Sequence, residues 1–325
     1  MSKAIGLISG GLDSSLAALT LKRQGVEVTG ISFVTPFFGA DKARKAAAQM
    51  EIPLIVRDIS EIHLEMLKNP VYGYGKNMNP CIDCHAMMFR LAGEVMQQEG
   101  FDFLFSGEVL GQRPMSQNMT ALHTVSKHSG LKGRILRPLS AKLLPITPME
   151  EEGLVDRERL LDIQGRSRKP QEALAVEWGL KEYPSSGGGC LLTEKSFAGR
   201  LRDLLEKNPS ATVVDVELLK VGRQFRLTPT VKLAMGRNQS DNERIKKLQR
   251  PADVLLRSAH FSGPLGLVSG EFTEQEMFQA AALVASYGKG KGEDELEVLA
   301  IQQDETKALT VKPLPREEAE QYKVD

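Results

Sequence analysis

Strand-like and helix-like segments alternate along the first 140 residues, and this alternation limits the possible folds more than any other feature of the chain. Each apolar run that suits a buried strand is followed by a segment in which apolar residues recur at helical spacing. Such alternation favours a parallel sheet with helices on both faces, so the predicted class is α/β and Rossmann-like. The expected strands are 4–7, 26–38, 52–59, 101–106 and 135–139, and the expected helices are 14–22, 41–50, 63–67, 84–98 and 116–127.

The character of the sequence changes near Asn208-Pro209-Ser210. Segments beyond this point, such as ATVVDVELLKVG and TPTVKLAMG, are typical of β-rich structure. We therefore predict a first domain at 1–208, a smaller α+β domain rich in strands at 209–310, and a loosely held tail at 311–325.

The charge of the chain is balanced overall but polarised locally. The 42 basic and 42 acidic residues cancel, so no global field indicates a nucleic acid or a membrane as partner. Between Lys220 and Arg257, however, ten basic residues face three acidic ones, and from Glu271 to Asp325 six face thirteen. A basic segment can follow a phosphate backbone, although an ordinary solvated surface gives the same pattern.

Composition also bounds the compartment. No apolar run reaches the roughly 18 residues of a membrane helix, and the start MSKAIGLIS lacks the layout of a signal peptide. The three cysteines are an odd number and suit a disulfide framework poorly. We expect a protein of the reducing cytoplasm, without a membrane partner; the oligomeric state is left open.

The stretch ISGGLDSSLAA, residues 8–18, lies where the first strand ends and the first helix begins. Gly10 and Gly11 allow a positive φ and a close approach of other backbone, while Asp13, Ser14 and Ser15 surround the first helical turn with polar groups. An anion would be held there by backbone N–H groups and the helix dipole, at the edge where parallel sheets bind ligands. The alternative is an ordinary capped turn between strand and helix.

SGGLDSS matches the SGGxDS signature of the PP-loop ATP pyrophosphatases, and the chain is identified as resembling that superfamily of adenine-nucleotide alpha hydrolases. The resemblance implies cleavage of ATP between its α- and β-phosphates, with Mg²⁺ as cofactor. It also implies that Ile31 to Phe33 line the adenine site and that Gly107 belongs to the nucleotide site. The residues implied for pyrophosphate and Mg²⁺ are Ser9, Gly10, Gly11, Asp13, Ser14 and Ser15.

The cysteines indicate which kind of substrate the cleavage of ATP would activate. Cys81 and Cys84 begin a predicted helix, where the dipole favours thiolate, and Cys190 follows three glycines. The C-x₂-C spacing suits metal binding or redox chemistry, although buried cysteines can also be small hydrophobic residues. A structural zinc normally has four ligands, whereas only three thiols are present. His85 is an awkward fourth ligand because it is adjacent to Cys84 in the sequence. Three thiolates suit a [4Fe–4S] cluster with one open iron.

This layout resembles the tRNA thiolation branch of the PP-loop proteins. The resemblance implies that ATP adenylates a base oxygen of tRNA, in uridine or cytidine, and that sulfur from a protein persulfide or sulfide replaces it. Some members are described with a cluster and others with a disulfide and a persulfide; three cysteines rather than two favour the cluster. The implied catalytic residues are Asp13, Cys81, Cys84 and Cys190, and the three cysteines are the implied cluster ligands.

One motif departs from that branch. Its members typically have Gly-His after the strand that follows the cysteine helix, whereas this chain has Ser106-Gly107-Glu108. Glu108 is a candidate for holding Mg²⁺ or for capping the next helix. Further candidates for contacts with phosphate, base or RNA are Gln112, Arg113, Gln117, Lys142, Arg166, Ser167, Arg168 and Lys169.

A second resemblance covers roughly residues 210–300, where VGRQFRLTPTVKLAMGRNQSDNERIKKL and FSGPLGLVSG are similar to the RNA-binding domain of the NFACT proteins. We therefore predict an ATP-dependent tRNA sulfurtransferase. Two alternatives remain: a PP-loop enzyme acting on a small molecule, as in the 7-cyano-7-deazaguanine or lactate-racemase-cofactor branches, and a non-catalytic RNA-binding protein. The predicted phosphate contacts are Arg223, Arg226, Lys232, Arg237, Lys246 and Lys247.

Overall fold

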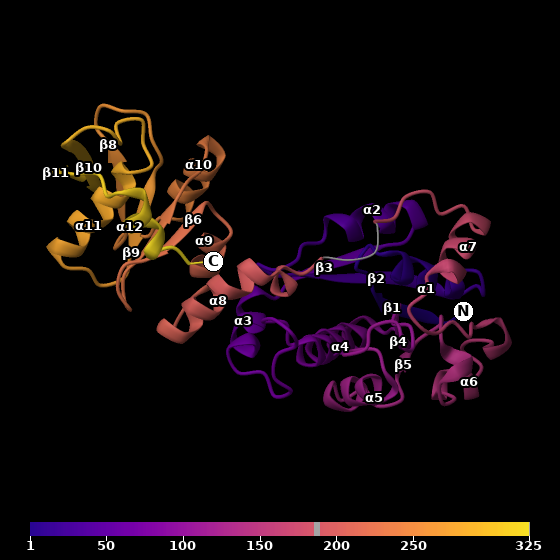
Figure 1. The fold of residues 1–325 in the computed structure, drawn as a ribbon. Coiled ribbons are helices and arrows are strands. Elements are labelled where there is room, and N and C mark those ends of the chain that lie inside the picture. The colour runs from indigo at the N-terminus through magenta and orange to yellow at the C-terminus, as the bar shows by residue number, and fades with distance from the viewer. Residues whose placement is uncertain (185–188, 325) are drawn as a thin grey trace. The chain divides into compact units, whose positions relative to one another are not determined.

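The computed structural model describes residues 1–184 and 189–324, and the chain divides into two compact units, Met1–Leu191 and Leu192–Asp325 (Figure 1). The division falls before the boundary near residue 208 that the sequence predicts. Helix α8 (Lys195–Lys207) accordingly belongs to the second unit.

The first unit is built on a five-stranded parallel sheet in the order β3-β2-β1-β4-β5, which confirms the predicted α/β class. Its strands are β1 (Lys3–Leu7), β2 (Glu27–Val34), β3 (Leu54–Asp58), β4 (Phe103–Ser106) and β5 (Ile135–Leu136). Its helices are α1 (Leu12–Lys22), α2 (Asp41–Met50), α3 (Ser60–Lys68), α4 (Cys81–Glu99), α5 (Met119–His128), α6 (Pro148–Glu151) and α7 (Lys169–Glu177).

Helices cover both faces of this sheet (Figure 1). On one face α1, α2 and α7 bury an apolar cluster that includes Leu16, Ala43 and Ala175. On the other face α4 and α5 bury a second cluster that includes Phe89 and Val125. With both faces covered, the central strands β1, β2 and β4 are mostly buried, as expected for a parallel sheet, whereas the edge strand β3 ends in exposed Arg57 and Asp58.

The strand order identifies the edge of the sheet at which a ligand is expected to bind. β1 is central and pairs with β2 on one side and β4 on the other, with Leu7 opposite Ser106 in the register. The connections from β1 and β4 therefore leave the sheet side by side at its carboxyl edge. Ligands of open parallel sheets bind at such a point, where the strand order reverses.

The second unit contains a six-stranded antiparallel sheet in the order β11-β10-β8-β9-β7-β6, which confirms the predicted α+β, β-rich class. Its strands are β6 (Arg223–Arg226), β7 (Lys232–Met235), β8 (Val254–Ser258), β9 (Gly266–Ser269), β10 (Leu296–Gln302) and β11 (Glu305–Val311). Besides α8, its helices are α9 (Val213–Leu219), α10 (Gln239–Leu248), α11 (Glu274–Ala285) and α12 (Arg316–Gln321).

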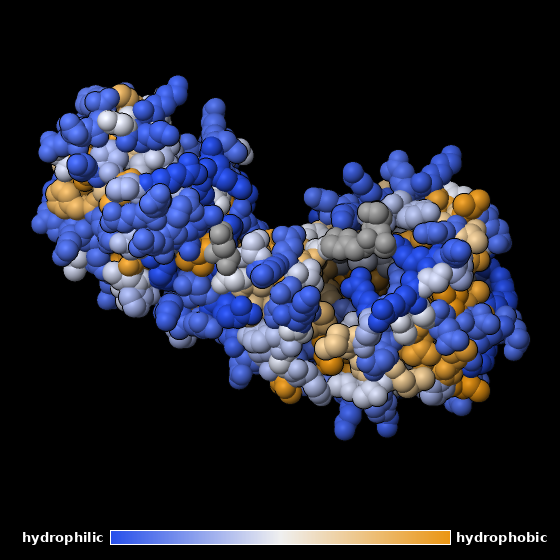
Figure 2. Space-filling view, viewed as in Figure 1, coloured by the Kyte–Doolittle hydropathy of each residue, from blue (hydrophilic) through white to orange (hydrophobic). Residues whose placement is uncertain are grey.

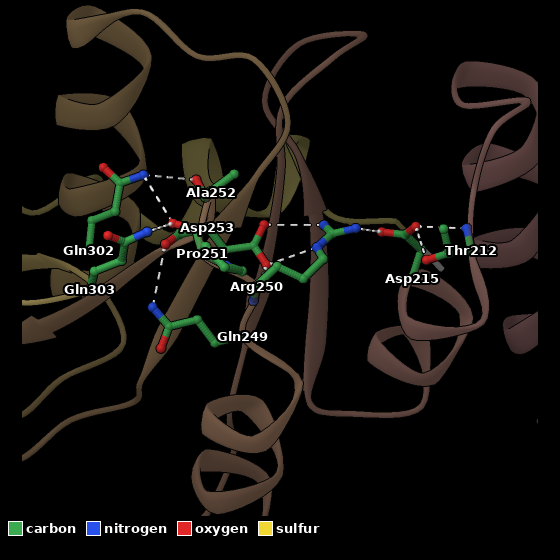
Figure 3. A network of polar contacts seen from close by, with 9 residues as sticks. All are labelled: Thr212, Asp215, Gln249, Arg250, Pro251, Ala252, Asp253, Gln302 and Gln303. Carbon is green, nitrogen blue, oxygen red and sulfur yellow. Dashed lines mark hydrogen bonds and ion pairs between the residues drawn. The ribbon is translucent and has the colours of Figure 1, made fainter.

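Helix α9 corrects one prediction, because ATVVDVELLKVG was expected to be β-rich. Thr212 and Asp215 form a capping box at its start, and the Asp215 carboxylate accepts a hydrogen bond of 2.8 Å from Arg250 Nη1 (Figure 3). Arg250 also donates to both carboxylate oxygens of Asp253, at 3.1 Å each. A cap and a tertiary ion pair thus outweigh the strand preference of the valines.

The carboxy-terminal residues are also more ordered than predicted. Beyond Val311 the chain forms α12, whose Ala319 is fully buried. Lys323 then pairs with Phe225 of β6, and Val324 N donates to Gln224 O at 2.9 Å. These residues belong to the second unit rather than to a loose tail.

Among the described residues, none of the helices combines the length and the apolar character that crossing a bilayer requires. The visible surface of each unit is mainly hydrophilic, with smaller hydrophobic patches (Figure 2).

Candidate active site

The loop between β1 and α1 has the geometry of an anion site. Gly10 adopts φ +78°, and a Cβ there would lie 2.3 Å from the backbone carbonyl carbon of Lys42 in α2. Gly11 is the N-cap of α1 and has no side chain to accept hydrogen bonds from the first turn. Its carbonyl instead accepts from Ser14 Oγ at 2.9 Å and from Ser15 Oγ at 3.1 Å. The first-turn N–H groups of α1 therefore keep their capacity to bind an anion.

The end of β4 lies directly against this loop. A Cβ on Gly107 would lie 2.4 Å from Ser14 N and 2.5 Å from the carbonyl carbon of Asp13. Only glycine allows this approach. The structure therefore places Gly107 beside the loop residues with which the sequence grouped it.

Asp13 lies at the centre of a polar cluster. Its Oδ2 accepts a hydrogen bond of 3.0 Å from Gln112 Nε2 and is 4.0 Å from Arg168 Nη2. Its Oδ1 accepts a weaker bond of 3.4 Å from Gln171 Nε2. Gln112 and Arg168 were candidates from the sequence, whereas Gln171 was missed because no motif surrounds it.

Ile31 and Phe33, predicted at the adenine site, have side chains packed in the core beneath α4. Ile31 O accepts a hydrogen bond of 2.9 Å from Ile8 N, so β2 supports the segment that leads into the loop. The adenine role of both residues stays a prediction.

Cys81 and Cys84 occupy the first turn of α4, as predicted. Cys81 Sγ accepts a hydrogen bond of 3.3 Å from Asn79 Nδ2, and Cys84 Sγ lies 3.4 Å from His63 Nε2. Burial raises the pKa of the Cys84 thiol, and the negative charges of Cys190, Cys81 and Asp83 raise this pKa further. The sequence-based expectation of a thiolate at Cys84 is therefore wrong for the protein without ligands, because burial outweighs the helix dipole.

Cys190 returns to the same region from a distant part of the sequence. Leu191 N donates to Phe37 O at 3.1 Å, and the Phe37 ring lies 5.3 Å from the ring of His63, which contacts Cys84. The negative charge of Cys190 is one of the causes that raise the Cys84 pKa. Cys190 thus lies in the same region as Cys84, its convergence with both other thiols stays a prediction, and the preceding glycines 187 and 188 lie outside the described residues.

Within residues 1–184 and 189–324, no group of three or more His, Cys, Asp or Glu side chains is arranged to hold a metal ion. The described thiols therefore do not form a ready-made metal site, and the [4Fe–4S] cluster stays a prediction.

His63 is a site residue that the sequence did not reveal. Its side chain is fully buried between Phe37 and Phe38, and burial lowers its pKa to about 4. The imidazole is consequently neutral at physiological pH, with Nε2 facing the Cys84 thiol. A single histidine in an amphipathic helix carries no sequence signal of such a contact.

Glu108, which follows β4, connects helix α4 to the sheet. Its Oε1 is 3.0 Å from His85 Nδ1, and its Oε2 accepts from Arg137 Nε at 2.9 Å and from Ser106 Oγ at 3.2 Å. Burial, the largest single influence, raises the Glu108 pKa, but the Arg137 charge and the His85 hydrogen bond together lower this pKa to about 2. Glu108 is therefore a buried carboxylate with both oxygens engaged.

The other polar candidates differ in their burial and in their partners. Gln117 is buried, whereas Arg113, Arg166, Ser167 and Lys169 are exposed. Lys142 Nζ donates to Glu158 O at 2.8 Å and so has a structural partner.

Several cations predicted to contact RNA are engaged within the second unit. Arg226 forms a two-point ion pair with Asp203, at 2.7 and 3.2 Å. Burial is the main cause that lowers the pKa of Lys232, to about 8. Arg223 stacks on the Tyr287 ring at 5.0 Å. The corrected prediction is that Arg226 and Lys232 stabilise the unit rather than contact phosphate.

Helix α10 presents the remaining cations. Lys246 and Lys247 are exposed in its last turn, and Arg244 is exposed one turn before them. Arg237, before the helix, is half exposed although it pairs with Asp241 at 2.9 Å. The part of the surface near α10 is hydrophilic in Figure 2.

Comparisons with known proteins bear on both units. Residues 1–142 match the family described as Thiamine biosynthesis protein (ThiI), and residues 222–323 match the family described as NFACT protein RNA binding domain.

Two curated relatives illustrate the similarity. The "Probable tRNA sulfurtransferase" of Oceanobacillus iheyensis is 29% identical over 141 residues, which cover 42% of this chain and 34% of that protein. The "tRNA-specific 2-thiouridylase MnmA" of Dichelobacter nodosus is 29% identical over 234 residues, which cover 65% of this chain and 59% of that protein. The chain thus matches less than two thirds of the length of either relative.

Among solved structures, a 4-thiouridine synthetase–RNA complex with bound ATP aligns over 67% of this chain and 52% of that chain. Its sequence identity is 19% and the TM-score is 0.41. The family matches agree with the loop, the parallel sheet and the basic β-rich unit described above. Residues 1–142 are therefore similar to the ThiI family, and residues 222–323 are similar to the NFACT RNA-binding domain family.

Proposed function

We propose that this chain is an ATP-dependent tRNA sulfurtransferase, which adenylates a uridine oxygen of tRNA and replaces that oxygen with sulfur. The observation that carries the proposal is the position of residues 106–108 at the end of β4. Gly107 contacts the loop at Asp13 and Ser14, while Glu108 contacts His85, next to Cys84. One short segment thus joins an anion-binding loop to a group of thiols.

In the first step the loop would hold the β- and γ-phosphates through the N–H groups at the start of α1. The base oxygen attacks the α-phosphorus, the bond from this phosphorus to the bridging oxygen breaks, and pyrophosphate leaves with the bonding electrons. Mg²⁺, when bound, would neutralise phosphate charge. Asp13 fits as its ligand, since Mg²⁺ sites commonly use one or two carboxylates together with phosphate oxygens.

In the second step a sulfur nucleophile displaces AMP from the activated carbon. If a sulfur donor has loaded one cysteine as a persulfide, its terminal sulfur forms the new C–S bond and AMP leaves. A second cysteine thiolate then attacks the remaining S–S bond, releases the thiolated base and leaves a cysteine disulfide, which an external thiol must reduce. His63 Nε2 lies 3.4 Å from Cys84 Sγ and so contacts the sulfur of one of these cysteines.

A [4Fe–4S] cluster is the other way to deliver sulfur. The donor chemistry of Cys81, Cys84 and Cys190 suits it, whereas the described side chains are not arranged as a metal site. Iron analysis after anaerobic purification decides between the two: about four irons per chain indicate a cluster, and none indicates the persulfide route.

The activity is tested by mass spectrometry of nucleosides from tRNA incubated with the protein, ATP and sulfide or a protein persulfide. We expect a thiolated nucleoside together with AMP and pyrophosphate. Asp13→Ala should abolish all three products. Alanine at any of the three cysteines should abolish the thiolated nucleoside. Asp41→Ala, which removes an exposed carboxylate from the first turn of α2, is the matched control. Formation of ADP and phosphate would contradict the proposal.

RNA binding is tested on α10. The double reversal of Lys246 and Lys247 to Glu should weaken tRNA binding and reduce its dependence on salt, because each lost phosphate contact removes about 0.9 from the slope of log K against log salt. Reversal of the exposed Lys289 and Lys291 serves as the control. Equal losses in both double variants would show that α10 is not the RNA surface.

A further inference from the structure

We propose that Arg168 and Gln171 complete the phosphate site from outside the family-matched domain, and that the Arg168 guanidinium binds the pyrophosphate part of the nucleotide. The inference rests on the proposed function, in that the β1–α1 loop binds ATP. Both residues lie beyond residues 1–142, which match the ThiI family. Neither belongs to a sequence motif of the loop.

The fold holds this segment against the loop in two ways. Leu110, which follows β4, pairs with Gln164 in a parallel bridge and accepts a hydrogen bond of 2.7 Å from Gly165 N. Helix α7 then packs on α1, with Ala175 fully buried in the cluster that contains Leu16. The segment between these anchors, which carries Arg168, is thereby fixed beside the first turn of α1.

The surroundings of Gln171 indicate that the segment carrying Arg168 and Gln171 forms part of a binding site. Its side chain is fully buried, its Nε2 donates to Asp13 Oδ1, and its Oε1 has no hydrogen-bond partner among the described residues. Gln112 does the same from the opposite segment, donating to Asp13 Oδ2 while its own Oε1 is unpartnered. Two amides thus orient one carboxylate, that of Gln171 fully buried and that of Gln112 half-buried, so Gln171 is a positioning residue for Asp13.

Arg168 has donors to spare at the same place. Its side chain is 16% exposed, and its Nη2 is 4.0 Å from Asp13 Oδ2, which is a loose ion pair. Its Nε is buried and has no partner within the described chain. A guanidinium presents five donors in a rigid fork that matches phosphate oxygens, and leaving a buried donor unmatched is unfavourable. An anion between Arg168 and the loop would satisfy these donors.

Charge favours the nucleotide over RNA as the source of that anion. Asp13 alone would repel pyrophosphate, and a cation beside it offsets this repulsion. Arg168 is largely buried next to Asp13, whereas its neighbours Arg166 and Lys169 are exposed and reachable by a large polyanion. The ligand is therefore the di- or triphosphate group of a nucleotide, bound inside the first unit.

The test uses isothermal titration of the full chain with inorganic pyrophosphate, α,β-methylene-ATP and AMP, each with Mg²⁺. For Arg168→Ala we expect the Kd for pyrophosphate and for the ATP analogue to rise about tenfold to a hundredfold, the range for one charge-assisted hydrogen bond. The Kd for AMP should stay within about twofold, because AMP lacks the group that Arg168 binds. Arg168→Lys should fall between, and Arg134→Ala, which removes an exposed arginine just before β5, should match the wild type in all three titrations.

Three results would overturn the inference: unchanged pyrophosphate binding in Arg168→Ala, an equal loss for AMP, or a wild type that does not bind pyrophosphate. Lost tRNA retention with intact pyrophosphate binding would assign Arg168 to RNA instead. Nucleoside analysis of tRNA reports separately on the proposed function. A chain that binds pyrophosphate through Arg168 but forms no thiolated base would leave this inference standing and refute the sulfurtransferase proposal.

Discussion

The substitution Glu108→Gln tests the buried network in which Glu108 contacts His85 of α4 and Arg137, which follows β5. A carboxyl whose pKa falls from 4.5 to about 2 on folding adds roughly 3 kcal/mol to stability at neutral pH, at about 1.4 kcal/mol per pH unit. Because the folded-state pKa is the lower one, this contribution is present above pH 4.5 and is lost as the pH falls from about 4.5 towards about 2. The variant also leaves Arg137, 7% exposed, without its counter-charge. We therefore expect a loss of about 3 to 5 kcal/mol at pH 7.

The assay can be confined to the first unit, because Trp178 is the only tryptophan of the chain and packs against the core of that unit. Urea unfolding followed by its fluorescence should show the full difference between wild type and variant from pH 7 to about 5. Below pH 4.5 the difference should shrink by about 1.4 kcal/mol per pH unit. A double variant that adds Arg137→Met should recover much of the loss, since it removes the uncompensated buried charge.

Glu94→Gln is the control, because Glu94 forms an exposed pair with Arg90 and should change stability by less than about 0.5 kcal/mol. A loss below about 1 kcal/mol for Glu108→Gln at pH 7, or a difference that stays constant from pH 6 to pH 3, would refute the reasoning.

Two further substitutions test the two units. Gly107→Ala should abolish binding of α,β-methylene-ATP and cost about 1 to 3 kcal/mol, since its Cβ would meet backbone at 2.4 Å, whereas Gly39→Ala, with nothing within 4 Å, should be neutral. Retained binding would show that the loop tolerates a displaced β4. Arg250→Met should destabilise the second unit by about 3 kcal/mol, because Asp215 and Asp253 lose their cation, while exposed Arg257→Met should change little. Circular dichroism during thermal unfolding measures the stability of the glycine and arginine variants, and isothermal titration measures the nucleotide binding. Equal melting curves for the two arginine variants would contradict the assigned role of Arg250.

The parts that sequence reasoning predicted are those that depend on neighbours along the chain. The β1–loop–α1 unit follows from an apolar run, two glycines and helical spacing, all within about 20 residues. The five-stranded sheet follows from the same local patterns repeated along the first 140 residues.

The parts that could not be predicted depend on contacts between distant segments. Val213 and Val214 favour a strand locally, but the Asp215–Arg250 ion pair helps to fix a helix there. Gln171 reaches Asp13 across 158 positions, and no motif signals it. The position of Cys84 at the start of a helix favours a thiolate, yet burial reverses this preference, and burial cannot be read from the four residues CIDC.

The carboxy-terminal residues determine whether the second unit can stay a single molecule. β6 is the last strand of its sheet, and an uncovered edge strand is a template on which another chain can add its own strand. Tyr322 O accepts from Arg226 N at 2.8 Å, and together with the Phe225–Lys323 pairing this occupies the free side of β6. A chain cut after Val311 would leave that edge open, so we expect it to associate with other copies, while the cations of α10 that we propose to contact RNA would remain in place.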